Sequence, residues 1–149
     1  IGGEGFDRSR LERLARRLGL VNPGRFIGNL PRPAALAEVA AADVFLHPSL
    51  HEAAGYACLE AMACGVPVVC LQRGGPGLMV TQDTGIAVPV LSPAQVIRDL
   101  AAGLDRLSRD DAGREAMGHR ARRRAIDFFA WEDKGRRMDE WYHSIVSGV

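Results

Sequence analysis

The sequence predicts an α/β protein with a Rossmann-like, doubly wound parallel sheet, followed by C-terminal helices. Short apolar runs typical of buried strands alternate with helical segments of about 8–14 residues, the spacing of strand–helix–strand units in a parallel sheet. Gly and Pro separate these runs. With 149 residues and 47% hydrophobic residues, the chain is large enough for a single domain with its own core. We therefore expect residues 1–149 to form one domain.

The N-terminal part begins with a Gly-rich turn over residues 2–5. Asp7 is placed to cap the next helix, whose leucines recur at helical spacing until Gly19 ends it. Residues 25–28 are a short strand candidate, and residues 33–41 form an Ala-rich helix with a Pro near its start.

The remaining elements alternate in the same way until the chain becomes helical. We expect strands over residues 43–46, 67–71 and 85–89, a helix over 55–63, a loop over 74–77, and helices over 94–107, 110–126 and 131–146. In a doubly wound sheet, ligands bind at the carboxyl ends of the strands. This rule predicts that Gly3, Gly28, the 47–55 loop and the 74–77 loop share one edge.

Composition excludes several classes of function. The net charge of +1 favours neither nucleic acid nor an anionic membrane as the main partner. The three cysteines form no C-x-x-C pair, which argues against a metal site and predicts reduced, buried thiols in a cytoplasmic protein. No apolar run approaches the roughly 20 residues that span a bilayer.

Four arginines, Arg120, Arg122, Arg123 and Arg124, cluster on the penultimate helix. We interpret them as a solvated helix face. Contact with an anionic membrane or a lipid-linked acceptor is the alternative, and it would place the protein peripherally at the inner membrane face.

The most informative stretch runs from residue 47 to residue 69. Glu52 lies in a loop at the ligand edge, and Gly55 opens a helix, so the N–H groups of Gly55, Tyr56 and Ala57 are expected to be unpaired. Such a helix start binds anions, commonly a diphosphate. Glu60 lies on the same helix, where a carboxylate accepts hydrogen bonds from vicinal hydroxyls. This order of groups complements a sugar–diphosphate–ribose ligand.

The two glutamates separated by seven residues, followed by Ala-Met-Ala-Cys-Gly-Val-Pro-Val-Val, resemble the signature of the family 4 retaining glycosyltransferases, which have the GT-B fold. The resemblance covers nearly the whole chain. It also rests on residues 3–5, 25–28, 41–45, 47–49, 74–76, 84–86 and 129–132.

The resemblance implies that this chain is the C-terminal, nucleotide-sugar-binding half of the GT-B fold. Glu60 then binds the donor ribose, Glu52 contacts the transferred sugar as the catalytic candidate, and the amides at Tyr56 and Ala57 hold the diphosphate. Gly55 allows the close approach of the donor. Phe is common in the family at the position of Ala54, which leaves the identity of the sugar open.

Further roles follow from the resemblance for residues outside this helix. Gly3 leaves room beside the donor, Gly28 lies near the nucleobase, and His51 belongs to the donor-binding set, while His47 is expected at the rim. Arg73 is a weak substitute for the basic residues that the family carries upstream. The family's first strand and N-terminal acceptor domain are expected before Ile1, and its last helix crosses back toward that domain.

The implied activity is retaining, hexosyl-type transfer from a nucleoside diphosphate sugar, with UDP favoured, to an acceptor sugar or lipid-linked glycan. No metal or other cofactor is expected, and the fragment alone is expected to be inactive. Two alternatives stay open: a nucleotide-sugar epimerase and a non-catalytic nucleotide-sugar-binding module.

Overall fold

The computed structural model describes residues 1–20 and 25–148. The chain divides into two compact units, which we call the N-terminal unit (Ile1–Glu38) and the sheet unit (Val39–Val149). Each unit is described by itself.

The N-terminal unit contains helix α1 (Arg8–Arg17), and helix α2 (Arg32–Ala40) begins in it. The chain around Gly2 runs parallel to the chain around Gly28 and meets it at a single bridge. Residues 25–28 therefore lie parallel to the N-terminal segment as expected, but the pairing is too short to form the predicted strand.

The start of α1 corrects a prediction about Asp7. Asp7 occupies the N-cap position, but its side chain makes no capping hydrogen bond. Its carboxylate instead accepts hydrogen bonds from Arg10, at 2.9 Å from Nε. A charged guanidinium three residues away is a stronger donor than a backbone amide, which explains the different partner.

The sheet unit is built on three parallel strands in the order β1-β2-β3: β1 (Phe45–His47), β2 (Val68–Leu71) and β3 (Gly85–Val88). The predicted strands lie within one or two residues of these positions. All four residues of β2 are buried, as expected for the central strand of a parallel sheet.

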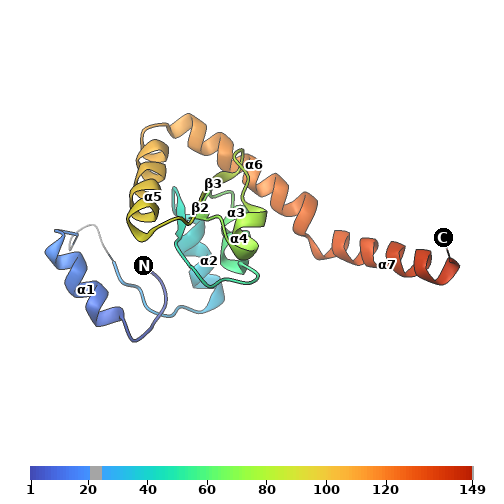
Figure 1. Cartoon of the computed structure of the whole chain (residues 1–149), viewed down its shortest axis with the longest axis horizontal. Helices are drawn as coiled ribbons and strands as arrows, with labels where there is room; N and C mark the ends of the chain where they lie inside the picture. Colours follow the sequence, from blue (N-terminus) through green and yellow to red (C-terminus); the bar gives the residue numbers. More distant parts are fainter. Residues whose placement is uncertain (21–24, 149) are drawn as a thin grey trace. The chain divides into compact units, whose positions relative to one another are not determined.

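Alternate residues of β2 pack on opposite faces of the sheet. Val68 and Cys70 belong to a core cluster with residues of α3 (Tyr56–Ala63), whereas Val69 and Leu71 pack in a second cluster with residues of α5 (Pro93–Ser108). Figure 1 shows these helices around the short strands. Both faces of the sheet are covered, so the structure confirms the doubly wound α/β prediction.

The predicted loop over residues 74–77 is wrong, because the chain forms a short helix there, α4 (Gly74–Met79). Gly75 N donates a 2.8 Å hydrogen bond to Ala53 O. A Cβ at Gly75 would lie 2.2 Å from Ala54 O. Two adjacent glycines therefore let this helix start touch the loop that precedes α3, a tertiary contact that local sequence does not reveal.

The three C-terminal helices follow their predicted ranges closely. They are α5, α6 (Asp111–Phe129) and α7 (Trp131–Ser147), drawn from yellow to red in Figure 1. Ser92 starts α5 with a complete capping box. No described residue of α7 is buried, and Trp131, Trp141 and Tyr142 are 79%, 63% and 60% exposed.

The three cysteines are free thiols, and two of them are buried as predicted. Burial, with smaller contributions from Cys70 and Glu52, raises the pKa of Cys58 to about 12. Burial also raises the pKa of Cys70 to about 11. Cys64 is partly exposed. Among the described residues, no helix is long and apolar enough to cross a membrane.

Candidate functional site

The candidate site lies where the chain leaves β1 and enters α3. Gly55 precedes the helix with a left-handed backbone, at φ 72°. A Cβ at this position would lie 2.7 Å from Cδ of Pro76 in α4. Both the backbone angle and the close contact favour glycine. Packing of α3 against α4 thus requires the glycine that sequence reasoning had attributed to ligand approach.

Glu52 caps the start of α3. Its Oε1 accepts a 2.9 Å hydrogen bond from Gly55 N, so the prediction that this N–H group is unpaired is wrong. Tyr56 and Ala57 are the first residues of the helix proper, and their N–H groups have no partner within the helix. Both residues are exposed. The N–H groups without a partner in the helix are therefore at these two exposed positions.

His47, expected at the rim of the site, lies beside Glu52. Its ring stacks on Phe45, with centroids 6.1 Å apart. The Nε2 atom is 3.5 Å from Oε2 of Glu52, is buried, and makes no hydrogen bond with the described residues. His47 is the last residue of β1, at the edge of the sheet where ligands bind. This place at the end of a strand is the sequence feature that indicates a position near the site.

Glu60 occupies the second turn of α3 and is partly buried. Glu60 lies on the same helix as Tyr56 and Ala57, about one turn further along the chain, whereas Glu52 precedes this helix. His51 is exposed in the loop before the helix. Two carboxylates thus flank a helix start whose dipole favours negative charge.

Gly3 and Gly28 lie in the N-terminal unit, where Gly3 N donates a 2.8 Å hydrogen bond to Gly28 O. Their φ angles are 98° and 68°, values that favour glycine. The structure therefore confirms that these two turns are neighbours. Their relation to the start of α3 stays a prediction.

The surroundings of the site bear on charge and metal binding. Arg73 is exposed and occupies the N-cap position of α4. Within the described residues, no group of three or more His, Cys, Asp or Glu side chains is arranged to hold a metal ion.

Comparison with known proteins gives the family. The profile of the family described as "Glycosyl transferases group 1" matches residues 1–124. A D-inositol 3-phosphate glycosyltransferase from Kribbella flavida is 40% identical over 120 residues, which is 80% of this chain and 27% of that protein. The protein of the same name from Kineococcus radiotolerans is 44% identical over 123 residues, covering 76% of this chain and 28% of that protein.

Solved structures agree on the fold. Sucrose-phosphate synthase from Thermosynechococcus elongatus matches with a TM-score of 0.80 and 29% identity, over 97% of this chain and 36% of that chain. WaaG, a glycosyltransferase involved in lipopolysaccharide biosynthesis, matches with a TM-score of 0.76 and 25% identity, over 100% of this chain and 38% of that chain. The chain has a fold found in GT-B glycosyltransferases and spans between a quarter and two fifths of these proteins. Because the profile covers most of its length, the chain belongs to the family of group 1 glycosyl transferases.

Proposed function

We propose that this chain is the donor-binding part of a glycosyltransferase that uses a nucleoside diphosphate sugar. One observation carries the proposal: Glu52 and Glu60 flank an open helix start at the carboxyl end of β1. Parallel α/β sheets bind ligands at this edge.

The diphosphate would lie against the first turn of α3. The N–H groups of Tyr56 and Ala57 point out of the helix start, and the helix dipole contributes about half a positive charge there. These groups stabilise the negative charge that develops on the leaving diphosphate. Charge stabilisation at the leaving group is a main source of rate acceleration in such reactions.

The two carboxylates would bind hydroxyl groups on either side of the diphosphate. Glu60 accepts hydrogen bonds from the ribose, and Glu52 faces the transferred sugar. Oε1 of Glu52 accepts a hydrogen bond from Gly55 N, and Oε2 lies 3.5 Å from Nε2 of His47, so a sugar hydroxyl would share the Oε2 side of the carboxylate with His47. Gly3, Gly28 and His51 complete the proposed donor-binding set.

In the reaction, the anomeric carbon loses the diphosphate oxygen and gains an acceptor hydroxyl oxygen, whose proton is released. We propose hexosyl transfer with retained configuration to an acceptor sugar or lipid-linked glycan. Glu52, beside the reacting sugar, is the catalytic candidate. Related proteins are about three times as long, so the acceptor site is proposed to lie in an N-terminal domain, with this chain alone inactive.

The names of the relatives favour a transferase over the epimerase alternative. An epimerase would release an altered sugar without any acceptor, whereas a non-catalytic module would bind the donor and leave it unchanged. Incubation of UDP-glucose with the longer protein, with and without a sugar acceptor, separates these outcomes by product analysis.

Donor binding is tested by ligand-observed NMR with UDP, GDP, ADP and UDP-glucose. Glu60→Ala is expected to weaken binding of the preferred nucleotide about tenfold, because a charged hydrogen-bond acceptor is lost. The matched control is Glu140→Ala on α7, which removes the same charge from an exposed position. Equal binding by the two folded variants would refute the role of Glu60, and absence of binding by the longer protein would refute the donor site.

A further inference from the structure

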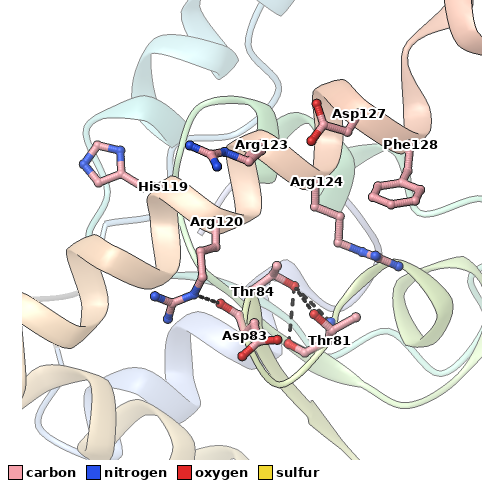
Figure 2. A pocket seen from close by; sticks show the side chains of 9 residues that line it. All are labelled: Thr81, Asp83, Thr84, His119, Arg120, Arg123, Arg124, Asp127 and Phe128. Carbon is pink, nitrogen blue, oxygen red and sulfur yellow. Dashed lines mark hydrogen bonds between the residues drawn. The ribbon is translucent and has the colours of Figure 1, made fainter.

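A cavity of about 360 Å³ lies between α6 and the segment that precedes β3. Figure 2 shows the side chains that line it: Thr81, Asp83, Thr84, His119, Arg120, Arg123, Arg124, Asp127 and Phe128. Thr84 directly precedes β3, so the cavity opens at the amino end of this strand. The proposed donor site follows the carboxyl end of β1, and in a parallel sheet these are opposite edges. The cavity is therefore separate from the donor site.

One wall of the cavity is held in place by hydrogen bonds. Arg120 Nε donates to Asp83 O at 2.9 Å, and Arg124 Nε donates to Met79 O at 2.8 Å. Thr84 is 3% exposed. Arg124 also lies over the Phe128 ring, 5.1 Å from its centroid. The segment before β3 is thus fastened to α6 by two guanidinium groups.

These contacts leave donors available on the α6 side. The bond from Arg120 uses Nε, and no hydrogen bond from its two Nη atoms is recorded with the described part of the chain. Within that part, the Arg123 side chain makes no hydrogen bond or ion pair, although Asp127 lies one turn further along α6. Arg123 follows Arg120 by three residues and His119 by four, the two spacings that make side chains neighbours on a helix.

An anion is the ligand that fits these groups. Guanidinium groups bind phosphoryl oxygens with two parallel hydrogen bonds, and two arginines one helical turn apart can share one phosphoryl group. Asp83 and Asp127 also line the cavity, and their carboxylates accept hydrogen bonds from hydroxyl groups. A small molecule that carries a phosphoryl group and hydroxyl groups therefore offers hydrogen-bond partners to the arginines and to the aspartates.

The geometry points to a second ligand site in this cavity, which binds the phosphoryl group of a phosphomonoester through Arg120 and Arg123. Soluble polyol phosphates and the headgroup of phosphatidic acid present this same group. The site goes beyond donor binding and uses none of the donor-binding residues.

The test follows backbone amide shifts of the chain during titration with glycerol 3-phosphate. A second arm measures sedimentation with phosphatidylcholine vesicles that contain or lack phosphatidic acid. The test variant is Arg123→Ala. Its matched control is Arg122→Ala, which removes the same charge from the neighbouring position, where Nη1 donates to Ala63 O at 3.1 Å outside the cavity. Circular dichroism confirms that both variants are folded.

We expect saturable shifts over residues 81–84 and 119–128, weakened about tenfold in Arg123→Ala and within twofold of the parent in Arg122→Ala. A soluble ligand is indicated if glycerol 3-phosphate gives this pattern without vesicle binding. A lipid ligand is indicated if sedimentation requires both phosphatidic acid and Arg123. Three results would overturn the proposal: no response in either arm, shifts confined to residues 55–57, or equal weakening by the two substitutions.

Discussion

Gly55→Ala tests the contact that shapes the start of α3. The substitution forces a residue with a Cβ into a left-handed backbone at φ 72°, which costs about 1–2 kcal/mol. The added Cβ would also lie 2.7 Å from Cδ and 3.0 Å from N of Pro76. Relief of such overlap within a packed region costs a further 1–3 kcal/mol or so.

The sum is a loss of about 2–5 kcal/mol in the free energy of unfolding, out of roughly 5–15 kcal/mol for a natural domain. Urea unfolding followed by circular dichroism measures it. The control is Gly135→Ala in α7, where a Cβ meets nothing within 4 Å. That substitution is expected to stabilise the helix by about 0.5–1 kcal/mol, because alanine has the higher helix propensity.

If Gly55→Ala changed stability by less than about 0.5 kcal/mol, the packing of α3 against α4 would be looser than the structure describes, since ordinary surface substitutions produce changes of that size. The explanation of the paired glycines at the start of α4 would then also need revision.

Three further predictions concern a helix cap and the thiols. Ser92→Ala removes the side-chain acceptor of the α5 capping box and should lower the free energy of unfolding by about 1 kcal/mol, measured in the same urea assay; an unchanged midpoint would contradict the cap. At pH 8, a thiol reagent should modify Cys64 in the folded chain but reach Cys58 and Cys70 only on unfolding, and equal labelling of all three would contradict their burial. The raised pKa values of Cys58 and Cys70 make both thiols neutral in the folded chain well above their ordinary value of 9.0, while the unfolded chain ionises there. Stability should therefore fall as pH rises from about 9 toward 11–12, and the Cys58→Ala variant should show a smaller fall between these values.

The alternation of elements could be predicted from sequence because it depends on local patterns. Val68, Val69 and Leu71 form an apolar run between turn residues, which indicates a buried strand in any context. The Ser92 cap and the helix that follows it are equally local. Glu52 before α3 and Glu60 within it could be found because their spacing and the helix start are contained in one short segment.

Contacts between distant segments decided the remainder. Residues 74–79 form a helix rather than a loop, where Gly75 bonds to Ala53, and no local pattern shows that contact. Glu52 accepts a hydrogen bond from Gly55 N because of the way the loop before α3 folds back. The sequence places a carboxylate near a helix start, but it does not show which N–H group that carboxylate binds.

The sequence by itself thus determined the α/β class, the order of the elements and the segment that carries the proposed donor site. Only the tertiary structure shows which contacts the arginines of α6 make. Arg124 binds the segment before β3, whereas the Arg123 side chain has no hydrogen bond or ion pair with the described residues. The physical reason is that helical periodicity assigns a side chain to a face, while its partner depends on which backbone carbonyls the rest of the fold brings within reach.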